Sequence, residues 1–247
     1  FPLEAGVPPG FAILDDQERQ TLLREALDET LAEAAADKAG PLWSALQKAV
    51  AYAVEDGFER ILPEVFARRG RAEEPLSELE LARIERQLRT ALGVRAGATA
   101  ETLTAELAEV FAEELLPMLA AALRAGTASD AEQADSLQLA INAGSVSRRA
   151  EALEGFFLTR DKKPRSRLAT KSVGTARPDV PPLLQTAQSQ FVAFHTEQKG
   201  LAVVEATIAL LRLATDVLAR YTAAKERSAA LDFDDLVGKA ASLLAAS

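Results

Sequence analysis

Residues 183–227 read LLQTAQSQFVAFHTEQKGLAVVEATIALLRLATDVLARYTAAKER, the longest helical pattern in the chain. Apolar side chains recur there at intervals of three and four residues, as on one face of an amphipathic helix. A single helix over this range would be roughly 60 Å long at about 1.5 Å per residue. Asp179, followed by Pro181 and Pro182, is typical of a helix start. Gly200 is the position where such a helix would bend or break, and the pattern leaves open whether it is one piece or two.

The rest of the chain carries the same repeat in shorter blocks. Ala, Leu, Glu and Arg dominate the composition and favour helices, and no run of alternating β-branched residues indicates a strand. Pro117 is expected to kink one block, and Ser129 with Glu132 and Ser147 are expected to start two others. The sequence therefore predicts a mainly α multi-helix domain with one long C-terminal helix, a basic loop and no significant sheet. The shorter helices are expected at 15–39, 42–69, 77–92, 100–124, 129–142 and 147–157.

The residue inventory excludes several kinds of site. The chain has no cysteine, which excludes disulfides and thiolate metal sites. His195 is the only histidine, so neither a conventional zinc site nor a Ser-His-Asp arrangement is expected. Because Phe191 and Phe194 flank it, we interpret His195 as a packed or half-exposed helix residue. We assign no catalytic residue, no metal ligand and no cofactor to this chain.

The chain contains no run of about 18 apolar residues, so no membrane partner is expected. It begins Phe1-Pro2-Leu3-Glu4, without the charged start and apolar core of a signal peptide. We therefore expect a cytoplasmic protein, and, since there is no initiator methionine, a piece of a longer one.

Charge is distributed unevenly along the chain. The formal net charge is −9, which argues against a general nucleic-acid binder. Between 148 and 177, however, nine basic residues face three acidic ones, a local charge of +6, which leaves −15 for the remainder. Such a segment could neutralise DNA phosphates, or it could be a solvated, mobile loop that happens to be basic. We call these nine residues the basic set: Arg148, Arg149, Arg160, Lys162, Lys163, Arg165, Arg167, Lys171 and Arg177.

The end of the chain carries the most specific motif. Tyr221 and Lys225 are followed by Leu-Asp-Phe-Asp-Asp-Leu at 231–236. This spacing resembles the segment that precedes the magnesium-binding Asp-Glu box of UvrD-like helicases of superfamily one. The stretch from Phe1 to Asp16 is similar to the segment just after the early helicase motifs of AddA proteins, in the form typical of alphaproteobacteria. The two matching ends cover about forty residues, and the middle of the chain matches only in character.

The resemblance implies the 1B accessory domain of an ATP-dependent helicase-nuclease acting in double-strand break repair. Residues 1–14 would leave the 1A motor domain, 15–230 would form the helical 1B domain, and 231–247 would begin the return into 1A, so both ends should lie close together. The implied partners are duplex DNA, bound without sequence specificity ahead of the motor, the remaining motor domains and an AddB-type second subunit. ATP and magnesium would belong to the parent protein.

The same C-terminal motif also has a purely structural interpretation. Asp232 would cap a helix, Asp234 and Asp235 would favour its positive end, and Phe233 and Leu236 would pack. A magnesium cluster is disfavoured, because three acids within four helix residues point in different directions.

The motifs of the motor itself are missing from this chain. It contains no Gly-x-x-x-x-Gly-Lys-Thr/Ser loop, and Asp28-Glu29 lies in a helical pattern without the apolar strand that should precede an Asp-Glu box. The chain itself is therefore not expected to be an enzyme, although its parent would be an ATP-binding hydrolase with helicase and nuclease activity.

Two further functions stay open. The chain could be a scaffold that docks the partner nuclease subunit, for which an exposed apolar stripe would be the discriminating feature. It could also be a self-standing helical regulator or ligand-binding bundle. The phenylalanines mostly fall at expected core positions, so contact with the DNA backbone is favoured over base stacking.

Overall fold

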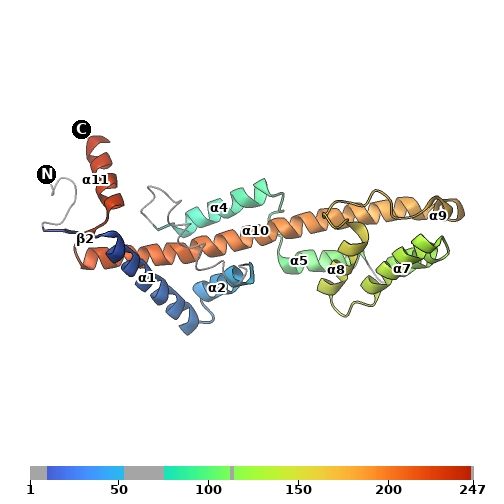
Figure 1. Ribbon diagram of the computed structural model, residues 1–247, viewed down its shortest axis with the longest axis horizontal. Coiled ribbons are helices and arrows are strands. Elements are labelled where there is room, and N and C mark those ends of the chain that lie inside the picture. The colour runs from blue at the N-terminus through green and yellow to red at the C-terminus, as the bar shows by residue number, and fades with distance from the viewer. Residues whose placement is uncertain (1–9, 53–74, 112–113, 246–247) are drawn as a thin grey trace. The chain divides into compact units, whose positions relative to one another are not determined.

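The computed structural model describes residues 10–52, 75–111 and 114–245, and helices dominate these ranges (Figure 1). The predicted mainly α fold class is confirmed. The chain divides into two compact units. We call residues 89–201 the central unit, and residues 1–88 with 202–247 the terminal unit. Helix α10 (Val180–Arg227, 48 residues) contributes to both.

Helix α10 is unbroken at Gly200, which settles the question that the sequence left open. Gly200 is buried beside the turn that follows α4 (Glu78–Ala91). A Cβ built on Gly200 would lie 2.9 Å from Val94 Cγ2 and 3.1 Å from the carbonyl oxygen of Leu92. The glycine therefore lets the backbone of α10 approach this turn closely, and it does so without interrupting the helix.

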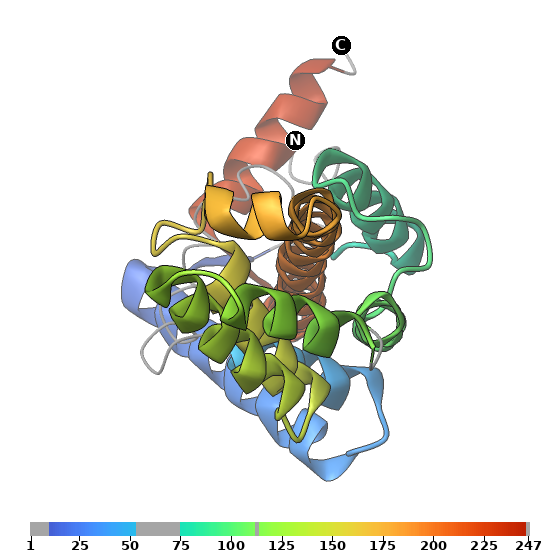
Figure 2. The same ribbon diagram turned by 90° about the vertical axis from the view of Figure 1, so that its right-hand side faces the viewer.

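The central unit packs short helices against the first part of α10. They are α5 (Ala100–Val110), α6 (Leu115–Arg124), α7 (Ala128–Ile141) and α8 (Val146–Phe157). Figure 2 looks along α10 and shows α7 and α8 on one side of it.

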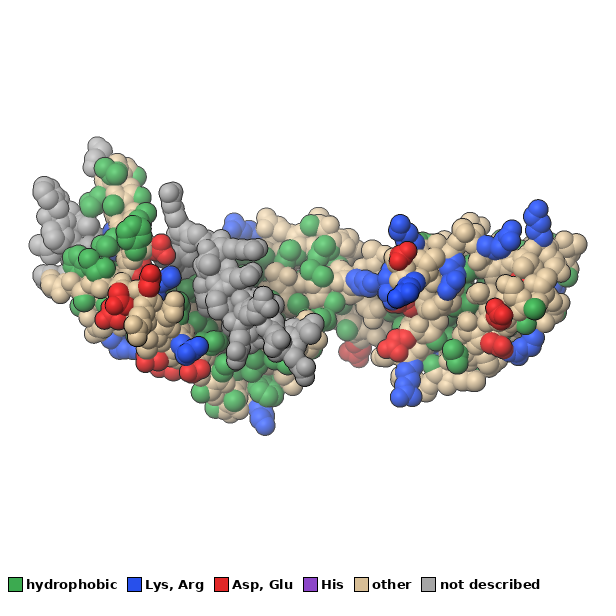
Figure 3. Space-filling model, in the orientation of Figure 1, with side chains coloured by type: hydrophobic (Ala, Val, Ile, Leu, Met, Phe, Trp, Pro, Cys, Tyr) green, Lys and Arg blue, Asp and Glu red, His purple; other side chains and the backbone are tan. Residues whose placement is uncertain are grey.

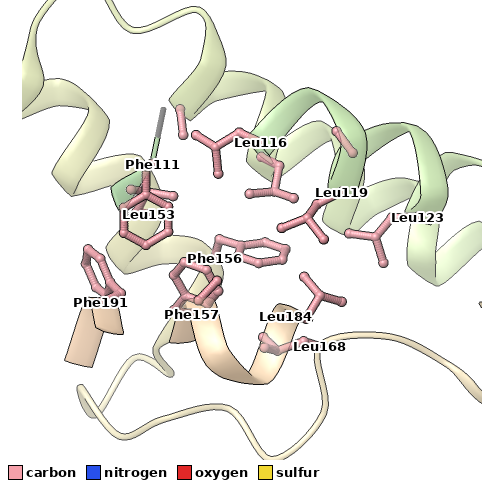
Figure 4. Close-up of a cluster of buried hydrophobic side chains, with 14 of the residues drawn as sticks. Phe111, Leu116, Leu119, Leu123, Leu153, Phe156, Phe157, Leu168, Leu184 and Phe191 are labelled. Atoms are coloured by element: carbon pink, nitrogen blue, oxygen red, sulfur yellow. The ribbon is translucent and has the colours of Figure 1, made fainter. Parts of the chain in front are cut away.

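Four fully buried phenylalanines form the centre of this core (Figure 4). The Phe157 ring is stacked on Phe191 at a centroid distance of 5.5 Å and meets Phe156 edge-on at 4.8 Å. Phe111 completes the group, 5.9 Å from Phe157. Aromatic pairs in these geometries add about 0.5–1.5 kcal/mol beyond the burial of their area. The rings therefore hold α5, α8 and α10 in fixed relation within this unit.

Three predicted boundaries in the central unit are wrong. The block 100–124 forms two helices, and Pro117 lies in the first turn of α6, where its missing N–H costs no hydrogen bond. Helix α7 is capped by Thr127 with Asp130, two residues before the predicted Ser129 and Glu132. Helix α8 likewise starts from Ser145, two residues before Ser147. Thr127 and Ser145 cap these helices through side-chain hydrogen bonds, and Asp130 of the first cap is also held by Thr170, a partner that is distant in sequence.

The terminal unit is built from α1 (Asp16–Ala36), α2 (Pro41–Tyr52), most of α4 and the later part of α10. Ala45 and Ala49 of α2 pack there against Ala209 and Leu213 of α10. The predicted helix over 42–69 is confirmed as far as Tyr52, and its remainder lies outside the described residues. The expected start of α1 at Asp15 is confirmed by a complete capping box with Glu18.

Segments near the two ends of the chain lie side by side in the terminal unit. Strand β1 (Ala12–Ile13) pairs in parallel with β2 (Ala230–Leu231), and helix α11 (Phe233–Ala245) follows at once. Ala12 N donates to Ala229 O at 3.1 Å, and Leu14 N donates to Leu231 O at 2.9 Å. The pairing brings residues 12–13 beside 230–231, and a pair this short agrees with the predicted lack of a significant sheet.

None of the helices in the described ranges is both long enough and apolar enough to span a lipid bilayer.

The close approach at Gly200 yields a stability prediction. Gly200→Ala should destabilise the chain by about 1–3 kcal/mol, because the added Cβ overlaps Val94 and the Leu92 backbone. Gly155→Ala in α8 is the matched control: nothing lies within 4 Å of its added Cβ, so the better helix propensity of alanine should stabilise the chain by up to about 1 kcal/mol. Urea unfolding followed by circular dichroism measures both, and equal effects would refute the packing role of Gly200.

Candidate nucleic-acid interface

The structure gathers the basic set in the central unit. Arg148 and Arg149 lie in the first turn of α8, five members lie between α8 and α9 (Lys171–Ala176), and Lys171 and Arg177 mark the two ends of α9. Figure 3 shows Lys and Arg side chains around α8 and toward α9 on the visible face of this unit. We call residues 158–177 the basic segment.

A tight turn begins the basic segment. Lys162 N donates to Thr159 O at 2.9 Å, and Thr159 N donates to Lys163 O at 2.7 Å. Lys162 has a φ of 59°, the left-handed conformation that closes a three-residue hairpin loop. Leu158 and Pro164 form an antiparallel bridge across its base. The turn thus holds the exposed side chains of Arg160 and Lys163 on a defined backbone.

Buried contacts anchor the rest of the basic segment. From α10, the Gln188 side-chain amide donates to Phe157 O at 2.9 Å and to Arg165 O at 3.0 Å. Leu168 enters the hydrophobic core, and α9 follows it. Residues 159–170 are thus the predicted basic loop, and the structure adds that long-range contacts hold this loop against the unit and that a short helix, α9, follows it.

Asp130 of α7 is the strongest of these anchors. Its carboxylate is 1% exposed and accepts hydrogen bonds from the Thr170 backbone N–H at 2.7 Å and hydroxyl at 2.6 Å. It also accepts from the Thr127 N–H and hydroxyl, at 2.8 and 2.7 Å. Burial raises the pKa of Asp130, but the hydrogen bonds from Thr170 and Thr127 outweigh it and lower the pKa to about 2. The Asp130 carboxylate therefore links the start of α7 to the start of α9.

Part of the basic set is held by internal partners. Lys162 pairs with Glu154 of α8, and Arg177 Nη2 lies 2.7 Å from Asp179. Arg165 donates to the carbonyl of Gly155 at 3.0 Å. The half-buried Arg149 has its Nε atom enclosed, without a hydrogen-bond partner among the described residues.

The other five members are exposed cations, and no carboxylate of the described ranges lies within 4.0 Å of any of them. We call them the free cations: Arg148, Arg160, Lys163, Arg167 and Lys171. The sequence does not tell which members of the basic set are paired, because Glu154 and Asp179 differ from other acidic residues only by their position in space.

The C-terminal motif forms a separate buried cluster in the terminal unit. Lys225 Nζ lies 2.9 Å from Asp232 and 2.6 Å from Asp235, and the Tyr221 hydroxyl donates to Asp232 at 2.7 Å. Asp232 and Asp235 also cap α11 reciprocally through their backbone N–H groups. The capping role predicted for Asp232 is thus confirmed.

Electrostatics binds this cluster together. Burial raises the pKa of Tyr221, and its hydrogen bond to the Asp232 carboxylate raises it further. Burial opposes ionisation of Asp232, but hydrogen bonds from Asp235 N–H, Tyr221 and Lys225 outweigh it and lower the pKa of Asp232. The two carboxylates already surround an ammonium group, so the cluster serves as a structural clamp between α10 and α11.

Two motif residues lie outside the clamp. Phe233 is 74% exposed and Asp234 is also exposed, so the predicted packing of Phe233 is wrong. Residues one or two positions apart on a helix do not share a face. Because the clamp holds the face of α11 that carries Asp235 inward, Phe233 and Asp234 point elsewhere and are exposed.

No protein-family model matches the chain, and no curated protein is significantly similar to it.

The Asp130 anchor predicts a pH-dependent stability loss. Asp130→Asn should cost about 2–3 kcal/mol at neutral pH, because an amide cannot accept all four hydrogen bonds. The pKa in the folded state is about 2, below its usual 3.8, so the stabilisation is present above about pH 4 and is lost as pH falls toward 2. Urea titrations across this range should show the two proteins converging in acid. Asp135→Asn, an exposed carboxylate on the same helix, is the control and should change stability by less than about 0.5 kcal/mol.

The clamp predicts a larger loss. Lys225→Met should destabilise the chain by about 3–5 kcal/mol, because it leaves two buried carboxylates without their cation. Phe233→Ser, in the same motif but exposed, should stay within about 0.5 kcal/mol of wild type. Thermal unfolding compares the two, and a Lys225→Met protein as stable as wild type would show that the clamp is dispensable.

Proposed function

We propose that this chain is the non-catalytic 1B accessory domain of an AddA-type DNA helicase-nuclease and that its basic segment contacts duplex DNA ahead of the motor. The observation that supports it best is the set of five free cations on an anchored backbone. ATP binding, hydrolysis and nuclease activity would reside in other domains of a cytoplasmic parent protein that acts in double-strand break repair.

The free cations suit a phosphate backbone. Each can neutralise a phosphate and release a counterion, so binding is independent of sequence and falls steeply with salt. Anchoring by Gln188 and Asp130 reduces the conformational entropy lost when the basic segment binds. The remainder of the chain carries −15, which repels DNA and confines contact to this surface.

Contact with phosphates is also favoured over base stacking. Among the described residues of the central unit, the four core phenylalanines are fully buried and Phe194 is half-buried, so none of these phenylalanines is exposed. A single-strand binder would present aromatic faces to successive bases. Duplex DNA, whose outer surface is phosphate, fits this surface better.

The paired ends support the assignment as an insert. Strands β1 and β2 place residues 12–14 next to 229–231, so a host domain could accept the chain at one location. Ile13 in β1 and Phe233, two residues after β2, are 61% and 74% exposed. The proposal assigns this apolar surface to contact with the 1A motor domain.

A second candidate, docking of the AddB-type subunit, is favoured by one observation. Phe233, Val237 and Leu244 are exposed and lie at i, i+4 and i+11, which places them on one face of α11. This is the exposed apolar stripe expected of a scaffold. A pull-down with the partner subunit using Val237→Ser and Leu244→Ser tests this candidate, because docking requires these two side chains whereas the 1A contact is assigned to Ile13 and Phe233. Capture that is unchanged in both variants refutes docking through the stripe.

Salt-dependent titration of labelled duplex tests the proposal. If all five free cations contact phosphates, affinity should fall about 500-fold between about 50 and about 200 mM salt. The triple variant Arg160→Glu, Lys163→Glu and Arg167→Glu should abolish binding.

A charge-matched control is Arg24→Glu, Lys38→Glu and Arg83→Glu, three exposed cations of the terminal unit. It should retain most of the affinity. Binding that survives the first variant would refute the assignment of the surface, and equal loss in both would show that only net charge matters.

A further inference from the structure

One carboxylate is shared between the basic segment and the only histidine. Glu154 of α8 accepts a hydrogen bond from Lys162 through Oε1, and its Oε2 lies 3.5 Å from His195 Nδ1. The three residues come from α8, the tight turn and α10. A proton on His195 therefore changes the charge balance at Lys162.

His195 is held firmly in this position. Its side chain is 12% exposed, and its ring stacks on Phe191 at 5.8 Å. Its Nε2 atom is enclosed and has no partner among the described residues. The predicted packed or half-exposed helix position is confirmed, and stacking on Phe191 holds the ring next to Glu154.

We propose that Glu154 masks Lys162 while His195 is neutral, and that protonation of His195 draws Glu154 toward the imidazolium and frees Lys162 to bind a phosphate. The inference rests on the proposed function, because it assigns a pH response to the same DNA-contacting surface. The predicted ligand remains the DNA backbone.

The charges around His195 set the pH at which this happens. Burial lowers the pKa of His195, Lys199 on the same helix and Lys162 lower it too, and Glu154 raises it. The hydrogen bond from Lys162 lowers the pKa of Glu154 below its usual range, so Glu154 stays charged when the histidine titrates. The group of Glu154, Lys162 and His195 thus passes from zero to +1 on acidification.

The contact can be measured without DNA. A single histidine gives one unambiguous NMR titration, whose midpoint should lie below 6.5. Glu154→Gln should lower the midpoint further, because the anion that stabilises the imidazolium is gone. Glu151→Gln, an exposed carboxylate of the same helix, should leave it unchanged. An unchanged midpoint in Glu154→Gln overturns the inference.

The consequence for DNA is measured by duplex affinity at about pH 7.5 and about pH 5. One additional phosphate contact at about 0.1 M salt should tighten wild-type binding about five- to tenfold more than that of His195→Gln, and steepen the salt slope by about 0.9. Glu154→Gln should bind tightly at both pH values. A His195→Gln variant with the full wild-type response overturns the regulatory role.

The two proposals can fail separately. Loss of all DNA binding in folded wild type would reject the proposed function, and the regulatory role with it, whereas the NMR shift in Glu154→Gln would still establish the charge coupling. If the wild type binds DNA and both His195→Gln and Glu154→Gln show the same change of affinity with pH as the wild type, the inference alone is rejected.

Discussion

The apolar stripe of α10 is the constraint on which both hydrophobic cores depend. In the central unit it contributes Val180, Leu184 and Phe191, and in the terminal unit it contributes Leu213 and Val217, all of them buried. A 48-residue helix that repeats apolar positions at three and four residues needs no partner sheet to bury them. Each shorter helix matches one segment of this stripe: buried phenylalanines meet it in the central unit, and alanine and leucine side chains of α1 and α2 meet it in the terminal unit.

Buried charged groups lie at two connections between helices. Asp130 joins the starts of α7 and α9, and the clamp of Lys225 with Asp232 joins α10 to α11. Removing such groups from water is costly unless every lone pair is satisfied, so each tolerates only one geometry. Hydrophobic packing alone would fix both connections less well. Without the Asp130 contact, the positions of the free cations would be less well defined.

The helical elements could largely be predicted from sequence, because periodicity and capping are local signals. The long helix, the caps at Asp15 and Asp232 and the membership of the basic set all follow from neighbours within a few residues. What could not be predicted depends on distant partners: Gln188 and Asp130 meet residues 23 to 40 positions away. Which cations are free depends on the same long-range folding. So does the exposure of Phe233, because the sequence of residues 231–236 is equally compatible with a buried phenylalanine.

The pairing of β1 with β2 also determines how the chain would bear tension. The strands run parallel, so a pull on the N-terminal side of β1 and the C-terminal side of β2 loads their hydrogen bonds in shear. Force between the two ends would cross Ala12 N–Ala229 O and Leu14 N–Leu231 O and would bypass the helices between them. The helical region would therefore be shielded from a force applied at the two ends until those few bonds break.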